Sequence, residues 1–186
     1  TYAPVFSGTV VQQNITSNGK TLGSITLNGT NTYQLQDDLS LTTGKSVTLT
    51  TGTLDLNGKN SSMGSFISSG SGVRTLLMGA GTVSLIDASA VWNTATVTNF
   101  TLTPSTSTID LTSTSTSART FTGGSKTYYN LNVGGATGTS ATTISGGSTF
   151  NTISSTKTVA HTIIPGTTTT VTNWTATGTV GNVLTI

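Results

Sequence analysis

The chain contains no cysteine and no glutamate, and only 6% of its 186 residues are charged. Without cysteine, disulfide bonds, cysteine-ligated zinc sites and thiol catalysis are excluded. The seven basic residues are scattered, so the net charge of +2 forms no basic patch that could follow a phosphate backbone. No apolar run approaches the ~20 residues of a membrane-spanning helix. We therefore expect neither nucleic-acid binding nor membrane insertion.

Small polar residues dominate what is present: 46 Thr, 24 Ser, 22 Gly and 13 Asn make up 105 of the 186 residues. The branched Cβ of Thr suits a pleated strand, and Gly and Asn tolerate the positive φ angles of turns. Apolar residues alternate with polar ones at a period of two rather than 3.6. The composition and the period together predict an all-β protein without long helices.

Similar strand-like motifs recur along the chain. SITL at 24–27, TLDL at 53–56, TVSL at 82–85 and TIDL at 108–111 begin 29, 29 and 26 residues apart. In the C-terminal third, Asn130, Asn151 and Asn173 stand beside large apolar residues at intervals of 21 and 22. A period in the twenties is typical of stacked repeats. We expect a parallel β-helix, or β-solenoid, with coils of about 22–29 residues.

Because alternate residues of a strand face inward, the four motifs predict two ladders of apolar side chains inside the solenoid. The first ladder comprises Ile25, Leu54, Val83 and Ile109, and the second comprises Leu27, Leu56, Leu85 and Leu111. An antiparallel β-sandwich is the alternative fold, and it explains the number of strands but not their repetition at one-coil intervals.

The solenoid is expected over residues 21–186, with an N-terminal strand over 1–20 leading into it. Neither end shows a polar cap, which a solenoid needs. We therefore expect a piece of a longer chain, or a subunit whose ends are covered by its neighbours.

Few residues could support catalysis. Asp55 and Asp110 occupy equivalent motif positions, which predicts a separation of roughly 9.6 Å, or two coil spacings, near the upper limit for an inverting glycosidase pair. Asp37 and Asp38 are adjacent, so in a strand they point to opposite faces and chelate calcium poorly. His161 is the sole histidine and is expected at the surface or in a turn. We expect no catalytic residue, no cofactor and no bound metal, and hence no enzyme.

The aromatic residues are candidates for a contact with sugar rings. Tyr128 and Tyr129 are adjacent, so one of them should face outward from a strand, and Trp92 is a third candidate. The alternative is that these rings fill wide corners inside the coils. Threonine-rich stretches at 106–108, 114–116 and 167–170 resemble the rows of ice-binding solenoids, although their spacing is irregular.

The stretches SITLNG, GTLDLNGKN, GGSKTYYNLNVGG and GGSTFNTIS resemble the Thr/Gly-rich β-solenoid regions of phage structural proteins, such as fibres and spikes, and of bacterial surface adhesins. The resemblance covers roughly residues 20–186 and carries no catalytic signature. It implies an extracellular protein on the surface of a virion or a cell. The implied partners are other copies of the chain, in a trimer or filament, neighbouring structural proteins, or a cell-surface glycan.

The sequence thus predicts a non-catalytic structural or attachment protein of a virion that forms a rigid shaft. A bacterial or archaeal cell-surface adhesin or extracellular filament subunit is the main alternative. A glycan-cleaving tailspike and an ice-binding solenoid are further alternatives, and a fold of this kind does not choose among them.

Overall fold

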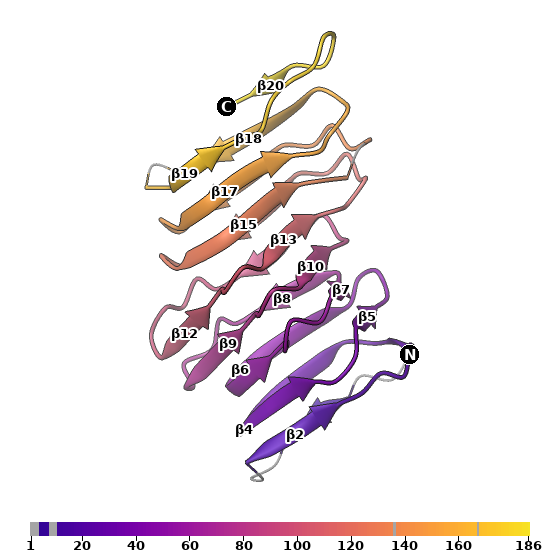
Figure 1. The fold of residues 1–186 in the computed structure, drawn as a ribbon, viewed down its shortest axis with the longest axis vertical. Helices are drawn as coiled ribbons and strands as arrows, with labels where there is room; N and C mark the ends of the chain where they lie inside the picture. Colours follow the sequence, from indigo (N-terminus) through magenta and orange to yellow (C-terminus); the bar gives the residue numbers. More distant parts are fainter. Residues whose placement is uncertain (1–3, 8–10, 136, 167) are drawn as a thin grey trace.

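A computed structural model describes residues 4–7, 11–135, 137–166 and 168–186. Within these residues every helix or strand element is a β-strand, and the strands pair in parallel from one coil to the next. The fold is a parallel β-solenoid of about eight coils, stacked along the long axis of Figure 1 from β2 at one end to β20 at the other. No helix in the described residues could span a membrane.

The coils have three faces, each built from strands that stack on one another. The first face consists of β1 (Val5–Phe6), the first halves of β4 (Ile25–Leu35) and β6 (Ser46–Asp55), β8 (Ser65–Ile67), β11 (Ser89–Asn93), β14 (Arg119–Thr122), β16 (Thr142–Ser145), β18 (His161–Pro165) and β20 (Leu184–Thr185). The second face consists of β2 (Gln12–Ile15), the second halves of β4 and β6, β9 (Arg74–Leu77) and β12 (Phe100–Thr103). The third face consists of β3 (Thr21–Leu22), β5 (Leu39–Leu41), β7 (Ser61–Met63), β10 (Thr82–Leu85), β13 (Thr108–Leu111), β15 (Thr127–Val133), β17 (Thr149–Ser155) and β19 (Thr170–Trp174).

The spacing between coils is set by the corner loops. Ile25 pairs with Val47, 22 positions later, whereas Trp92 pairs with Phe121, 29 positions later. The extra residues of the longer coils lie in corner loops at 68–73, 94–99 and 112–118, between consecutive strands. Insertions at corners leave the strand register intact, and this is why coils of unequal length stack on one another.

Turns are made by residues that tolerate positive φ. Asn57 and Gly58, with φ of 51° and 67°, turn the chain between β6 and β7. Gly52, with φ of 86°, lies where β6 bends from the first face to the second. An added Cβ at Gly52 would stand 2.2 Å from the carbonyl oxygen of Gly29 in the coil below. The bend therefore requires glycine for both its conformation and its close backbone contact.

The interior contains a column of aromatic rings in the middle coils. Trp92 lies 4.6 Å from Phe66 and 5.6 Å from Phe121, measured between ring centroids, and the Phe121 ring is almost parallel to the indole at 9°. Tyr128 and Phe150 extend the column, with their centroids 5.4 Å apart. All five rings are buried. Such rings contribute more buried apolar area than any aliphatic residue, so they make a large part of the core of the longer coils.

The eight residues of the two predicted ladders are all buried. The pairing of β10 with β13 sets Val83 beside Ile109 and Leu85 beside Leu111, as the motifs predict. Alternating burial along both strands follows the period of two seen in the sequence.

The remaining four residues do not belong to the same ladders. Ile25 and Leu27 lie on the first face, Leu54 lies on the second, and Leu56 follows β6 at the next corner. The interval of 29 residues is one coil of 22 plus the seven residues that lead to the next face. The motifs at 24–27, 53–56 and 82–85 therefore step from face to face, and a single repeating ladder through them is wrong.

The segment before residue 21 is part of the solenoid. β1 and β2 both pair in parallel with β4, and Tyr33 donates a hydrogen bond of 3.0 Å to the carbonyl oxygen of Phe6. The described residues of this segment thus form the first coil rather than a separate strand leading into the fold.

Candidate functional site

Polar side chains form regular rows on the outside of the solenoid. The row on the second face comprises Thr32, Thr53, Thr75 and Thr101. The row on the third face comprises Thr82, Thr108, Asn130, Thr152 and Asn173. Because each coil adds one residue at about 4.8 Å, the hydroxyls and amides stand at near-constant spacing. The rows are neutral, and each group both donates and accepts hydrogen bonds.

The threonine-rich stretches that resemble ice-binding rows do not form these rows. Thr106 lies in the turn between β12 and β13, and residues 114–116 lie in the corner loop 112–118. Thr167 lies outside the described residues, and Thr170 begins β19. The stretches occupy different corners of the coils, whereas the observed rows come from isolated threonines one coil apart.

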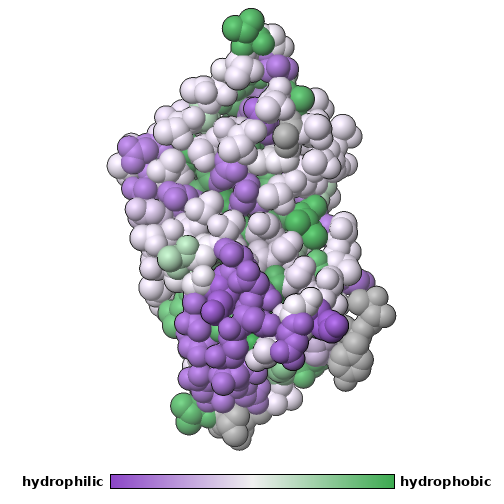
Figure 2. Space-filling view, turned by 45° about the vertical axis from the view of Figure 1, so that its right-hand side comes forward, coloured by the Kyte–Doolittle hydropathy of each residue, from purple (hydrophilic) through white to green (hydrophobic). Residues whose placement is uncertain are grey.

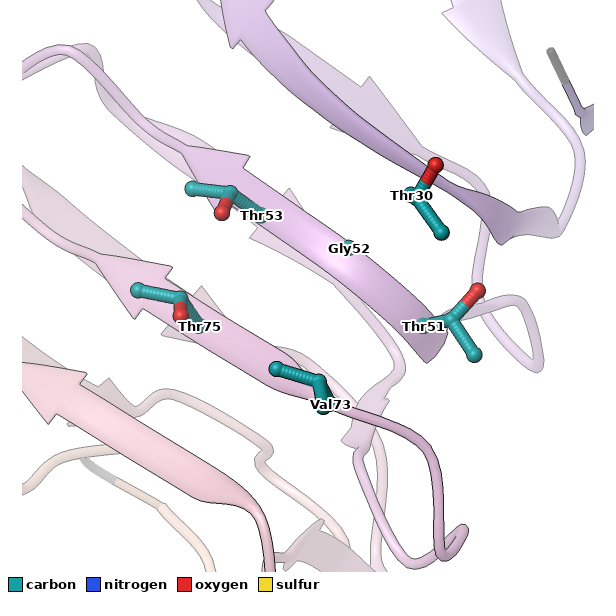
Figure 3. A pocket seen from close by; sticks show the side chains of 6 residues that line it. All are labelled: Thr30, Thr51, Gly52, Thr53, Val73 and Thr75. Carbon is teal, nitrogen blue, oxygen red and sulfur yellow. The ribbon is translucent and has the colours of Figure 1, made fainter. Parts of the chain in front are cut away.

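A groove of about 370 Å³ opens where the first face bends into the second (Figure 3). It is lined by Thr30, Thr51, Gly52, Thr53, Val73 and Thr75. Figure 3 shows that these side chains come from β4, β6 and the start of β9, with Thr53 and Thr75 on neighbouring strands.

The chemistry of the groove is neutral. Four threonine hydroxyls surround the methyl groups of Val73, whose side chain is 72% exposed. Gly52 keeps the floor open because no side chain fits at that position. Hydroxyls beside an apolar surface suit one sugar ring, and no titratable group lines the groove to support acid or base chemistry.

A network of amides covers the outside of the first coils. Gln12 donates to Asn14 and to Gln34, each at 3.0 Å, and Gln36 donates to Asn14 at 3.1 Å and to Gln34 at 3.0 Å. Gln34 in turn donates to Asp55 at 2.8 Å. Figure 2 shows hydrophilic side chains gathered in the lower, N-terminal half of the surface, with residues of intermediate hydropathy above them. The amides bond mainly to one another, so they stabilise the stacking of neighbouring coils.

The three aromatic candidates for a sugar contact have different environments. Trp92 and Tyr128 are each 1% exposed and belong to the interior aromatic column, so neither reaches a ligand on the surface. Tyr129 is half-buried and faces away from the column. The expectation of a surface contact is therefore wrong for Trp92 and Tyr128, because the longer coils need large rings to fill them.

The acids Asp55 and Asp110 do not share a site. Asp55 pairs with Leu77 on the second face, and Asp110 pairs with Ser84 and Asn132 on the third. The Asp110 carboxylate accepts a hydrogen bond of 2.8 Å from Asn132, and partial burial raises its pKa. The equivalent positions expected from the motifs do not exist, for the same reason that the ladders differ.

Asp37 and Asp38 hold turns together. Asp37 accepts hydrogen bonds from the backbone N–H groups of Ser17 and Asn18, both at 2.7 Å, and from the Ser17 hydroxyl at 3.0 Å. These bonds, chiefly that from the Ser17 backbone, lower the pKa of Asp37. Asp38 accepts from the backbone of Asn60 at 2.9 Å. No group of three or more His or Asp residues in the described ranges is placed to hold a metal ion.

His161 is buried, contrary to its expected place at the surface. Its Nδ1 lies 2.8 Å from the carbonyl oxygen of Val159, so Nδ1 carries a proton and donates it. Its Nε2 lies 2.8 Å from the Ser155 hydroxyl. The imidazole thus bonds to the chain on both sides and fixes the corner between β17 and β18.

Sequence reasoning missed three buried cations. Arg74 and Arg119 are 0% exposed and Lys157 is 6% exposed. Each donates hydrogen bonds to backbone carbonyls of corner loops. The signal lay in the placement of Arg74 and Arg119, since each stands one residue before an alternating strand pattern, where an inward side chain is expected.

The chain matches no family model, no curated protein and no solved structure.

Proposed function

We propose that the chain is a non-catalytic shaft of a virion structural or attachment protein, such as a fibre, a spike or a surface decoration. The observation that carries this proposal is the stacking of about eight coils along one axis, which gives a rod of ~38 Å at ~4.8 Å per coil. The resemblance of the Thr/Gly-rich repeats to phage fibres and spikes favours this use of the rod.

The mechanism is mechanical. Each coil is hydrogen-bonded to the coils above and below along three faces, and the interior is filled by apolar ladders and the aromatic column. Bending such a rod would open backbone hydrogen bonds and core contacts together, so the structure resists it. A surface of hydroxyls and amides with few charges depends little on the salt of the medium.

The side faces supply the contacts. The proposed partners are other copies of the chain, in a trimer or filament, and neighbouring structural proteins. The neutral groove at Thr53, Thr75 and Val73 is our candidate for a cell-surface glycan. The proposed location is extracellular, on the surface of a virion.

The alternative is a bacterial or archaeal surface adhesin or extracellular filament subunit. The neutral groove and the polar rows favour it as well, since an adhesin also presents a rigid side face to a glycan. The two proposals differ in the particle that carries the chain.

Immuno-electron microscopy separates them. Antibodies raised against the purified chain would be applied to virions and to cells from the source culture, with the same serum depleted on the purified chain as the control. Gold on virion fibres or spikes supports the first proposal, and gold on the cell envelope or on filaments supports the alternative. Labelling of neither particle, with a strong signal inside cells, contradicts both.

A further inference from the structure

The two fully buried arginines occupy matched positions. Arg74 is the first residue of β9 and follows corner loop 68–73, and Arg119 is the first residue of β14 and follows corner loop 112–118. Each side chain points into the solenoid and folds back toward the loop. A buried guanidinium is costly unless its N–H groups are all paired, so the two sites can be compared donor by donor.

The Arg74 site is complete. Its Nε donates to the carbonyl oxygen of Gly72 at 3.0 Å, and its Nη1 donates to Ser68. Its Nη2 donates to the carbonyl oxygens of Thr96 at 3.0 Å and Thr98 at 2.7 Å. Every nitrogen of the guanidinium has an acceptor, and the loops of two coils satisfy the charge without a carboxylate.

The Arg119 site is only half complete. Nη1 donates to the carbonyl oxygens of Leu111 at 2.6 Å and Gly134 at 3.5 Å, but Nε and Nη2 have no partner among the described residues. These two nitrogens share one edge of the guanidinium, the edge that binds anions with two parallel hydrogen bonds.

Two more unpaired groups lie beside that edge. Thr142 is the register partner of Arg119 on the neighbouring strand β16, and Ser140 stands two residues earlier, on the same inward side. Both side chains are at least nine-tenths buried, and neither hydroxyl has a hydrogen-bond partner in the described chain. One corner therefore holds four buried polar atoms without partners: two guanidinium donors and two hydroxyls.

The local charge is positive. Buried Lys157 donates to the carbonyl oxygens of Gly135, at 3.1 Å, and of Gly138. Burial, followed by the nearby charge of Arg119, lowers the pKa of Lys157 to about 8. Asp110 attracts Arg119 electrostatically, but its carboxylate accepts its hydrogen bond from Asn132. Two cations thus lie close together, and the nearby acid does not occupy the free guanidinium edge.

We propose that the corner formed by Arg119, Ser140 and Thr142, beside Lys157, binds a small monovalent anion such as chloride. The anion accepts from Nε and Nη2 of Arg119 and from both hydroxyls, and it offsets the charge of the two cations. Water would pair the same atoms but would leave both charges uncompensated. Four donors converging beside two cations select an anion over a neutral ligand.

The test compares thermal unfolding of the 186-residue chain in sodium chloride and in sodium gluconate of equal ionic strength, since gluconate is too large for a buried corner. We expect the unfolding midpoint to be higher in saturating chloride by at least ~3 °C, because a ligand that binds the folded state stabilises it. Thr142→Val and Ser140→Ala should each reduce this gap to less than half. The control is Ser61→Ala, which removes another buried, unpaired hydroxyl far from any buried cation, and which should keep the full gap.

A crystal grown in sodium bromide supplies a second measurement. We expect an anomalous peak within hydrogen-bond distance of Arg119 Nε and Nη2. Equal midpoints in the two salts, or a bromide crystal with no anomalous peak at this corner, would overturn the proposal and indicate that water fills it. A gap that persists unchanged in Thr142→Val and Ser140→Ala would also overturn it, because the anion would then bind elsewhere.

Discussion

The indole nitrogen of Trp92 donates a hydrogen bond of 3.0 Å to the phenol oxygen of Tyr128, although 36 positions separate the two residues in the chain. The same phenol donates to the carbonyl oxygen of Gly123 at 2.9 Å and lies 3.0 Å from the hydroxyl of Thr94. Tyr128 is thus the polar centre of an otherwise apolar column, and it joins two successive coils through side chains as well as backbone.

We predict that Tyr128→Phe lowers the free energy of unfolding by about 1–3 kcal/mol, since the buried partners of the hydroxyl lose their hydrogen bonds while the ring still packs. Urea unfolding followed by circular dichroism measures this loss. Tyr129→Phe is the control, because Tyr129 is half-buried and lies outside the column, and it should change stability by less than ~0.5 kcal/mol. Equal effects of the two variants would contradict the placement of Tyr128.

The same residue predicts a dependence of stability on alkaline pH. Burial raises the pKa of Tyr128 to about 12, above the ordinary value of 10.0. The folded state therefore holds this proton more tightly than the unfolded state, and stability is lost as the pH rises from about 10 to about 12. Stability measured against pH should fall more steeply over this window in the native chain than in Tyr128→Phe. Identical slopes would show that the phenol is accessible to water.

The bend at Gly52 predicts a large penalty for one methyl group. In Gly52→Ala the new Cβ would lie 2.2 Å from the carbonyl oxygen of Gly29 and 2.7 Å from that of Asn31, at a φ of 86°. We expect a loss of at least ~2 kcal/mol from strain and forced displacement of backbone. Gly19→Ala is the control, with a similar φ of 68° and no atom within 4 Å, and it should cost about 1 kcal/mol. Thermal unfolding of both variants measures the difference, and a smaller effect at Gly52 would contradict the close contact of the two coils.

Arg74 should stabilise the corner loops that it bonds. In Arg74→Met the carbonyl oxygens of Gly72, Thr96 and Thr98 lose their donor, and we expect a loss of about 3 kcal/mol. The loops at 68–73 and 94–99 should also become sites of limited proteolysis, which mass spectrometry of the fragments would locate. Lys20→Met removes an exposed cation and should leave both stability and the cleavage pattern unchanged. Cleavage of Arg74→Met elsewhere, with both loops intact, would contradict this role.

The sequence predicted the fold class correctly because the signal is local. Alternation in motifs such as TVSL and TIDL marks short strands, and Asn57-Gly58 marks a turn, whatever the strands pair with. The β-solenoid followed from the recurrence of these motifs. The assignment of motifs to faces failed because a single interval of 29 residues describes equally well one long coil and one short coil plus a face. Ile25 and Leu54 could be separated only by knowing their partners.

The candidate sites were harder to predict because they depend on packing between coils. Trp92 and Tyr128 looked available because aromatic rings often bind sugars, yet the corner loops at 94–99 and 112–118 lengthen these coils, and the longer coils take large rings inside. The groove at Thr53 and Thr75 arises from a bend in β6 that no motif marks except Gly52. The free edge of Arg119 depends on which carbonyls reach it, a matter of loop geometry rather than of sequence pattern.

The central claim, parallel coils stacked in this register, is tested most directly by engineered disulfides in a chain that has no native cysteine. Thr82 and Thr108 are register partners on neighbouring coils, so their Cα atoms should lie at the ~4.8 Å strand spacing, within the range that a disulfide spans. The account predicts rapid and complete oxidation of the Thr82→Cys, Thr108→Cys variant with its fold retained. It predicts little oxidation of the Thr82→Cys, Asp110→Cys variant, which is shifted by two residues. Failure of the first pair to oxidise, or equal oxidation of both pairs, would contradict the solenoid and favour another arrangement of the strands.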